Sequence, residues 1–278
     1  MGVTGALERI AEDAARGNLV FSSNAEVVLG VQRAVDDPDC TMDKLCRLIS
    51  AEPMLSTRIV AVANSVAYRR AGPASADVKS AVSRLGFRNV RTLAAAVLIR
   101  QLRDMARTPE HRALARELWE HSAHVAALAR VIAQKIVRLD PDTAFFAGIV
   151  HEAGGFYLIA RAASFPDLLT EGLGEWEGNG EAIVGGAVLR ELDVPDAVLE
   201  AVEELWEGYL RYPPVRLGDA LLLAEHLSPV ESPLARLGGM EHRGVHADID
   251  VAIDEDTLKH ILAESAADVK SLIEALDF

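Results

Sequence analysis

Apolar residues recur at every third or fourth position through most of the chain, which is the spacing that lines one face of an α-helix. The stretch 89–105 is a clear example, because its valines and leucines fall on a single stripe. The pattern predicts helices over residues 7–15, 26–35, 42–50, 55–63, 78–85, 89–105, 111–137, 143–160, 181–192, 197–206, 215–227 and 255–276. We therefore predict an all-α fold.

Breaker residues separate these segments. Pro53 suits a first helical turn, and Gly86 is expected to end its helix as a left-handed cap. Four glycines predict a surface loop over residues 171–180, and residues 228–250 are polar and irregular. Weak alternation of apolar and polar residues over 245–253 leaves a short strand there as an alternative.

The composition bears on where in the cell the protein is found. No apolar run reaches the ~18–20 uninterrupted residues of a membrane span, and the acidic residues among positions 1–16 do not suit a signal peptide. The two cysteines, Cys40 and Cys46, are too few for a disulfide framework in 278 residues. We expect a cytoplasmic protein that does not bind a membrane.

The charge of the chain is uneven. The net charge is −14, divided into +3 over residues 1–110 and −17 over residues 111–278. Nucleic-acid affinity depends on cations that neutralise phosphates, so an acidic second half disfavours general nucleic-acid binding. The asymmetry also suggests two substructures with different surfaces.

Histidines and carboxylates gather in two stretches of the second half. His121 and His124 are three residues apart on one face of a predicted helix, and His151 precedes Glu152 at the end of an apolar run. Imidazoles and a carboxylate are the ligands of a hydrolytic metal site. The same residues could also be the remnants of such a site.

Five stretches, in order, resemble the HDOD family, the output-domain relatives of HD-type metal phosphohydrolases. They are LISAEPML at 48–55, VANS at 62–65, AVSRLG at 81–86, LWEHS at 118–122 and AGIVHEAG at 147–154. The resemblance implies an HDOD-type multi-helix bundle with an HD-phosphohydrolase-like helical portion. We expect an N-terminal helix at 1–17, an HDOD domain at 18–240 and a C-terminal helical extension at 241–278. Within the domain, residues 18–110 form an N-terminal portion and residues 111–240 an HD-like portion.

The resemblance also implies where a metal site would lie. The family's pattern of His, His-Asp and a distant Asp corresponds to His121, His151, Glu152 and Glu225 in this chain. Glutamate replaces both aspartates, and one extra methylene displaces a carboxylate by ~1.5 Å where metal distances hold within ~0.2 Å. Further histidines that many relatives carry are absent, since Ala182 and Ile183 and then residues 204–206 occupy those positions.

Three interpretations of the site remain open: buried imidazoles in a helical core, one weakly held divalent metal, or catalysis. We favour the first, and so predict a vestigial metal site with no catalysis and no required cofactor. The resemblance then implies a stand-alone module of bacterial signal transduction that acts by protein–protein interaction. The alternatives are a metal-dependent phosphohydrolase of a nucleotide or cyclic dinucleotide, and a nucleotide-binding sensor without turnover.

Arginines form two sets at helical spacing, which could make basic stripes for docking. The sets are Arg84, Arg88 and Arg91, and Arg100, Arg103 and Arg107. The simpler interpretation is a solvated face with local ion pairs. The alternative is an interaction face for an acidic partner or a phosphorylated ligand. The acidic half of a second copy is one candidate, so self-association is a further expectation. The sequence does not identify the signalling partner.

Overall fold

The structure is a computed structural model that describes residues 3–16, 25–69, 73–165, 168–169, 176, 180–238 and 255–277. Every long regular element in these ranges is a helix, which confirms the all-α prediction. The helices of the first half are α1 (Val3–Ala15), α2 (Ala25–Asp36), α3 (Met42–Ser50), α4 (Pro53–Asn64) and α5 (Val78–Asp104). Those that follow are α6 (Pro109–Ile132), α7 (Pro141–Val150), α8 (Ala153–Ala162), α10 (Glu181–Glu191), α11 (Asp196–Glu207), α12 (Leu217–Leu227), α13 (Pro233–Gly238) and α15 (Glu255–Leu276).

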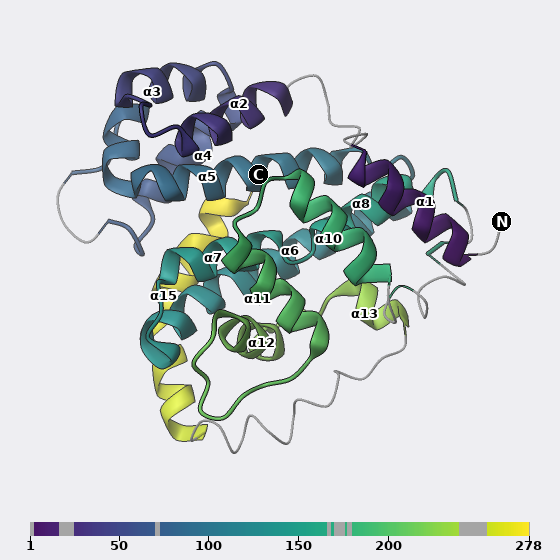
Figure 1. Ribbon diagram of the computed structural model, residues 1–278. Helices are drawn as coiled ribbons and strands as arrows, with labels where there is room; N and C mark the ends of the chain where they lie inside the picture. The colour runs from purple at the N-terminus through teal and green to yellow at the C-terminus, as the bar shows by residue number, and fades with distance from the viewer. Residues whose placement is uncertain are drawn as a thin grey trace.

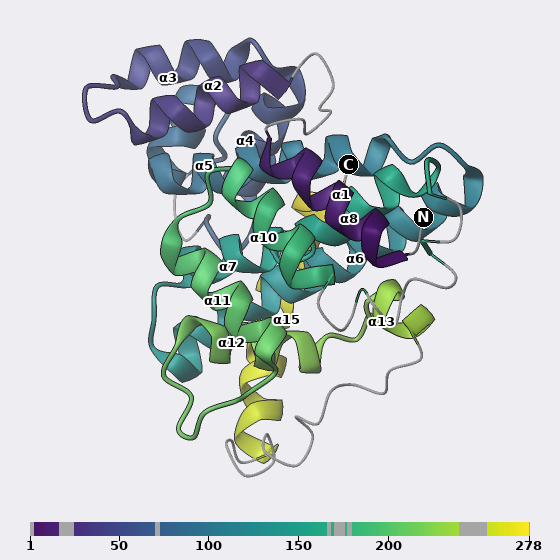
Figure 2. The ribbon, with the colours of Figure 1, turned by 45° about the vertical axis from the view of Figure 1, so that its right-hand side comes forward.

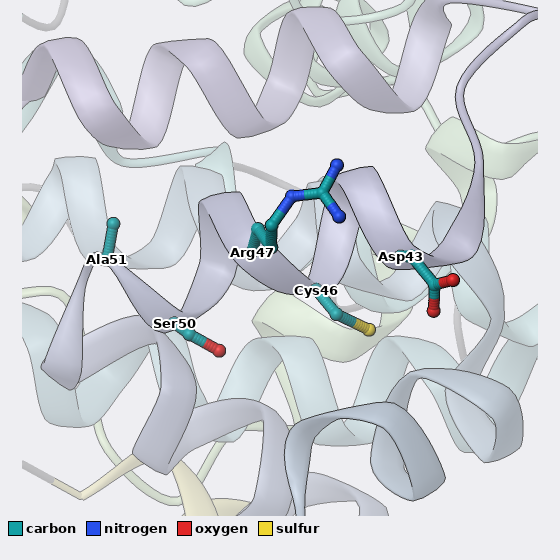
Figure 3. Close-up of a pocket in the computed structure, with 5 residues that line it drawn as sticks. All are labelled: Asp43, Cys46, Arg47, Ser50 and Ala51. Carbon is teal, nitrogen blue, oxygen red and sulfur yellow. The ribbon is translucent and has the colours of Figure 1, made fainter.

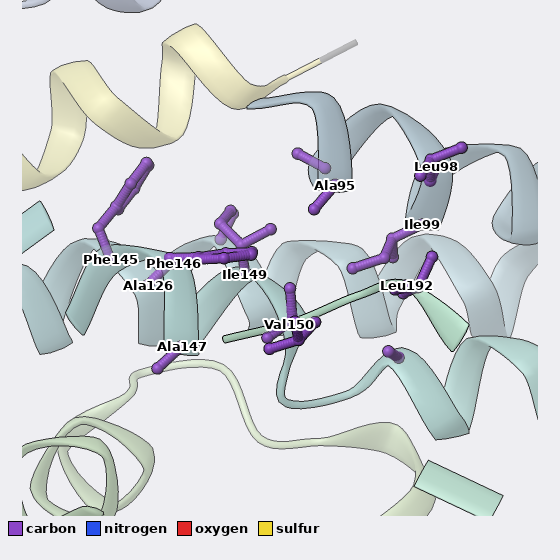
Figure 4. Close-up of a cluster of buried hydrophobic side chains, with 14 of the residues drawn as sticks. Ala95, Leu98, Ile99, Ala126, Phe145, Phe146, Ala147, Ile149, Val150 and Leu192 are labelled. Atoms are coloured by element: carbon purple, nitrogen blue, oxygen red, sulfur yellow. The ribbon is translucent and has the colours of Figure 1, made fainter. Parts of the chain in front are cut away.

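Two helical portions meet along α5. Helices α2, α3 and α4 pack on its first half, whereas α7 and α8 contact it from the other side (Figure 1). Its residues between Leu93 and Ile99 are all buried, because this helix has core on both sides. Figure 4 shows this joint core, in which Ala95, Leu98 and Ile99 of α5 face Ile149 and Val150 of α7.

The terminal helices cover the HD-like portion and tie the two portions together. Helix α1 lies along α10, apart from α2 and α3 in both views (Figures 1 and 2). Helix α15 packs on α4 and α6. Arg58 of α4 donates to the Ala275 carbonyl at 3.0 Å, and Ser271 Oγ accepts from the Val66 amide at 2.9 Å.

Gly86 breaks helical geometry as expected, but not as a left-handed cap. Its φ of 78° is positive, while its ψ of 164° is extended, a combination that glycine alone adopts readily. The chain re-enters helical geometry immediately, so α5 continues across the kink to Asp104. Two helical segments therefore meet at Gly86, in agreement with the prediction of helices at 78–85 and 89–105, although no loop separates them.

The predicted helix over residues 143–160 is wrong in one respect that matters for the site. The helix stops at Val150 and restarts at Ala153, with His151 and Glu152 at the junction. The span from Pro141 to Ala162 is long and apolar enough to cross a membrane by length and composition, with a mean hydropathy of 1.3 over an 18-residue stretch, although Asp142, Glu152 and Arg161 interrupt its apolar residues. Because 94% of it is buried inside the fold, it is a core segment.

Other differences are local. The predicted helix over 111–137 ends as α6 at Ile132 and continues as the wider π-helical turn η1 (Ala133–Val137). The irregular stretch over 228–250 contains the short helix α13, and the alternative strand at 245–253 lies outside the described residues. Most of the predicted loop at 171–180 also lies outside them, although Trp176 is described and is buried rather than on the surface.

A polar network joins the two portions at the start of α7. The Tyr68 hydroxyl donates to Asp142 Oδ1 at 2.8 Å, and Asn89 Nδ2 donates to Asp142 Oδ2 at 2.9 Å. Arg130 of α6 donates to the same carboxylate at 3.3 Å and lies 4.7 Å from the Tyr68 ring centroid. Burial, and then the Asp142 carboxylate, raise the pKa of Tyr68, so its hydroxyl keeps the proton it donates.

Removing the Tyr68 hydroxyl should weaken this joint. We expect Tyr68→Phe to lower the free energy of unfolding by about 1–3 kcal/mol, because the hydrogen bond to a carboxylate is lost. Urea denaturation measures the change. Tyr209→Phe is the control: that side chain is 69% exposed, and its change should stay within about 0.5 kcal/mol. Equal effects of the two substitutions would contradict a role for the network.

The contact between α6 and α7 allows no side chain at Gly148. A Cβ there would lie 2.3 Å from Ala126 Cα, whereas a Cβ at Gly30 in α2 would meet nothing within 4 Å. We expect Gly148→Ala to destabilise the protein by about 1–3 kcal/mol through overpacking. Gly30→Ala should instead stabilise it by about 0.5–1 kcal/mol, because alanine favours the helix. Urea denaturation that gave both variants the same sign would contradict this packing.

Candidate metal centre

The four residues expected at a metal site come together from four parts of the chain. His121 lies in the middle of α6, and Glu225 lies in the last turn of α12. His151 is the C-terminal cap of α7, and Glu152 is the N-terminal cap of α8. The break between α7 and α8 therefore turns adjacent residues inward, which one continuous helix would not do, since residues i and i+1 do not share a helix face.

Backbone carbonyls fix the orientation of both imidazoles. His121 Nδ1 lies 2.7 Å from the Val230 carbonyl, and His151 Nδ1 lies 2.8 Å from the Gly148 carbonyl. A carbonyl only accepts, so each Nδ1 carries a proton and donates it. In the neutral ring the other nitrogen, Nε2, then presents a lone pair. This is the arrangement that histidine adopts as a metal ligand.

The two lone pairs point at one place. His121 Nε2 and His151 Nε2 are 3.2 Å apart, and Glu225 Oε2 lies 3.1 Å and 3.4 Å from them. Two ligands of a tetrahedral zinc at bond lengths of 2.0–2.1 Å are separated by ~3.3 Å. Glutamate in place of aspartate has thus not moved Glu225 out of reach.

Three acceptors facing one another need a cation between them. Glu225 Oε2 is buried and receives no hydrogen bond from neutral imidazoles. A proton on His121 is one solution: burial of the ring lowers its pKa, but the Glu225 charge and hydrogen bond, with Glu152, outweigh burial and raise the pKa to about 9. Burial raises the pKa of Glu225, but the imidazoles outweigh it and the net pKa is lowered. A divalent ion is the other solution, and the donor set fits one.

Glu152 stands slightly back from this point. Its Oε1 lies 4.0 Å from His121 Nε2 and accepts a hydrogen bond from Ser232 Oγ at 2.7 Å. One ligand atom from each of His121, His151 and Glu152 fits within a 4.8 Å cluster. Glu152 can therefore serve as a fourth ligand or as an anion beside the other three.

Three of the four residues are buried, whereas the side chain of Glu225 is 28% exposed and borders solvent. The exposed fractions are 0% for His121, 4% for His151 and 6% for Glu152. Residues 228–238, which follow α12, cover the site and supply the Val230 and Ser232 contacts. Sequence reasoning missed these two residues, because a backbone carbonyl has no sequence signature and a lone serine resembles any loop serine.

The neighbouring histidines do not take part. His124 Nδ1 bonds to the Glu120 carbonyl at 2.8 Å on its own helix, and the described metal cluster includes neither it nor His226. Where relatives carry further histidines, Glu204 pairs with Arg216, and Trp206 packs on Gly185, where a Cβ would lie 2.7 Å from the indole. Among the described residues, a donor set for one metal ion is present around His121 and His151, and none for a second ion is found beside it.

The arginines do not form free basic stripes. Arg84 donates to the Ala63 carbonyl at 3.0 Å and the Pro73 carbonyl at 2.7 Å. Arg88 pairs with Asp140, and Arg91 pairs with Asp36 and donates to the Asp193 carbonyl. The acidic partner of this set is thus largely the chain's own second half.

The second arginine set is also occupied or displaced. Arg100 and Arg103 lie 3.4 Å and 3.3 Å from Asp104, and the Arg103 guanidinium stands 5.9 Å from the Trp119 ring centroid. Arg107 lies past the end of α5, so these three residues do not share one helix face. This placement does not favour the predicted interaction face.

Asn64 and Ser65, which belong to one of the stretches that resemble the family, satisfy backbone groups. Asn64 exchanges two hydrogen bonds with the Ser75 backbone, at 2.9 Å and 2.7 Å, and Ser65 donates to the Val62 carbonyl at 2.7 Å. These bonds fix the turn after α4. They leave no group of either side chain that requires a ligand.

A hollow of about 570 Å³ lies on α3, away from the metal residues (Figure 3). Asp43, Cys46, Arg47, Ser50 and Ala51 line it, all from one helix and its end. Burial raises the pKa of Cys46, so its thiol stays protonated and unreactive. Its polar groups do not converge, and the chemistry of the chain lies instead at the histidine pair.

Comparison with known proteins shows which family and which solved structures this chain resembles. Residues 22–206 match the model of the HDOD domain. A candidate metal-dependent phosphohydrolase from Shewanella amazonensis SB2B has a similar structure, with 23% identity, 99% of each chain covered and a TM-score of 0.71. An HDOD domain protein of unknown function from Geobacter sulfurreducens is also similar, with 20% sequence identity, 99% of each chain covered and a TM-score of 0.62. No curated protein matches the chain.

A third solved structure extends beyond the length of this chain. It is a candidate signal transduction protein from Marinobacter aquaeolei VT8, with 16% identity and a TM-score of 0.59. The alignment covers 99% of this chain and 67% of that protein. At these identities the three structures show a shared helical fold.

Proposed function

The chain belongs to the HDOD family, and from this premise we propose that it is a regulatory module of bacterial signal transduction. It acts by binding a partner protein, without catalysis, and holds one divalent cation at His121, His151 and Glu225. The observation that carries the proposal is the convergence of three buried acceptor atoms under a covering segment. The cation is a revision of the sequence analysis, which favoured structural imidazoles.

The donor set supports a borderline divalent metal. Two imidazole nitrogens and a carboxylate suit zinc, iron or manganese. When bound, the ion would supply the positive charge that the buried carboxylates lack. His121 and His151 would bind through Nε2 because their Nδ1 protons are committed to backbone carbonyls.

The burial of the ligands supports a role without turnover. A phosphate ester must reach the metal, yet His121, His151 and Glu152 are buried, and Ser232 is bonded to Glu152. The residues after Glu152 are alanine and two glycines, which offer no cation to a transition-state phosphate. Buried histidine ligands and the lack of a nearby phosphate-binding cation after Glu152 favour a structural metal site over a hydrolytic one.

An exposed loop between α11 and α12 supports a protein partner. Tyr209 and Tyr212 are 69% and 72% exposed there, and Val215 is 56% exposed. Asp219 holds the loop by accepting from the Arg211, Val215 and Arg216 amides at 3.1, 2.9 and 2.8 Å. Aromatic side chains on a rigid loop are typical of protein interfaces, since little entropy is lost on binding.

Metal content is the first test. After incubation with manganese, iron or zinc and desalting, elemental analysis should find about one ion per chain. His151→Ala should lose it, whereas the control His124→Ala should retain it, because His124 bonds within its own helix. Metal at 100 times its Kd should stabilise the wild type by about 2.7 kcal/mol. No stoichiometric ion under any condition would return the histidines to a structural role.

Catalysis is the second test, because the ligand set also suits the alternative of a phosphohydrolase. We expect metal-loaded wild type and His151→Ala to release phosphate or nucleotide from phosphomonoesters, phosphodiesters and cyclic dinucleotides at the same background rate. Metal-dependent turnover that disappears in His151→Ala would establish the enzyme instead. A nucleotide that raises Tm without turnover would support the sensor alternative.

A further inference from the structure

Residues 228–238, hereafter the strap, form a separate covering element over the candidate metal centre. Ser228 stiffens the start of the strap, since its hydroxyl donates to the Val230 carbonyl at 2.7 Å and lies 3.3 Å from the Val230 amide. Helix α13 forms its second half, and Arg236 pairs with Glu117 of α6. The strap therefore leaves α12 with a defined conformation and is fastened at both ends.

Two polar contacts connect the strap directly to the ligands. The Val230 carbonyl accepts from His121 Nδ1 at 2.7 Å, on the side of the ring opposite the converging nitrogens. The Ser232 hydroxyl donates to Glu152 Oε1 at 2.7 Å, and Ser232 itself is 6% exposed. One strap thus orients ligands from α6 and from the junction before α8.

Apolar packing seats the strap between these contacts. Leu234 is 2% exposed and lies over Gly155. A Cβ on Gly155 would lie 2.7 Å from Leu234 Cδ1, 2.8 Å from Glu152 Oε2 and 3.2 Å from Leu118 Cδ2. The absence of a side chain at Gly155 is therefore what lets Leu234 close beside the carboxylate.

We propose that the strap and the cation site are coupled: the closed strap holds His121 and Glu152 in the binding arrangement, and the bound cation keeps the strap closed. Groups that hydrogen-bond to metal ligands set their orientation and basicity. Coupling of this kind is reciprocal. If strap closure raises the affinity for the ion by some factor, the bound ion favours strap closure by the same factor. Ser232 is a positioning residue in this scheme, and the proposal rests on the cation of the proposed function.

Through this coupling, binding of a cation at the site would change which side chains are exposed on the protein surface. An open strap would uncover Leu234 and Leu118, which are 2% and 0% exposed in the closed form. It would also leave Arg236 without Glu117. Loss of the cation would thus change the apolar and charged surface near α6 that a partner can contact.

Calorimetric titration of the full chain with Zn²⁺, and separately with Mn²⁺, tests the polar contact. We expect Ser232→Ala to weaken binding about 10- to 100-fold, the range for groups that support metal ligands. Ser232→Thr keeps the hydroxyl and should bind much closer to wild type than Ser232→Ala does. Ser83→Ala is the matched control, since that hydroxyl bonds to the Lys79 carbonyl on the distant α5 surface.

Hydrogen exchange with and without the same ions tests the reverse direction. Amides of residues 228–238 should exchange more slowly in the loaded wild type. Leu234→Ala should remove much of this protection, although it leaves the three ligands and Glu152 unchanged. Wild-type affinity in Ser232→Ala, or equal exchange of the strap in both states, would overturn the coupling. If His151→Ala still abolishes binding in that case, the cation site stands and the strap proposal alone fails. Absence of ion binding by the wild type would instead overturn both.

Discussion

The need for positive charge among buried acceptors is the constraint around which the second half of the chain is built. Two imidazole nitrogens and Glu225 Oε2 lie within 3.4 Å of one another, with Glu152 behind them. In a medium of low polarity such a group is stable only with a cation or a shared proton at its centre. Helices α6, α7 and α12 each contribute one acceptor, so their packing depends on what occupies that point.

The first half of the chain fixes one of those helices. Asp142, in the first turn of α7, is held by Tyr68, Asn89 and Arg130, and His151 caps the other end. Ten residues of helix span about 15 Å, and a helix behaves as a rigid rod over that length. The N-terminal portion therefore sets the angle at which His151 enters the site. Arg88 and Arg91, which bind acidic residues of the second half, support the same joint.

Periodicity predicted most helices because each buries one face against its neighbours, as α2 and α4 do against α5 and α12 does against α6. The motif order predicted which of the eight histidines matter, and His121 and His151 do meet. What the sequence could not reveal lies in the backbone. Buried residues on both sides conceal the stop at Val150, since the nearby glycines, Gly148, Gly154 and Gly155, lie inside α7 and α8 and not between them. The roles of the Val230 carbonyl and of the strap could not be predicted from the sequence either, because they arise only when segments far apart in the chain pack together.

The two glutamates differ in a way that their shared chemistry conceals. A longer side chain lets Glu225 reach the nitrogens from α12, whose backbone would leave an aspartate carboxylate ~1.5 Å short. The Oε1 atom of Glu152 instead bonds to Ser232 of the strap and stays 4.0 Å from His121 Nε2. One glutamate thus completes the ligand set while the other engages the cover. In the sequence, glutamate in place of aspartate suggests that a hydrolytic site has been lost. In three dimensions, the same substitution is compatible with a structural metal site.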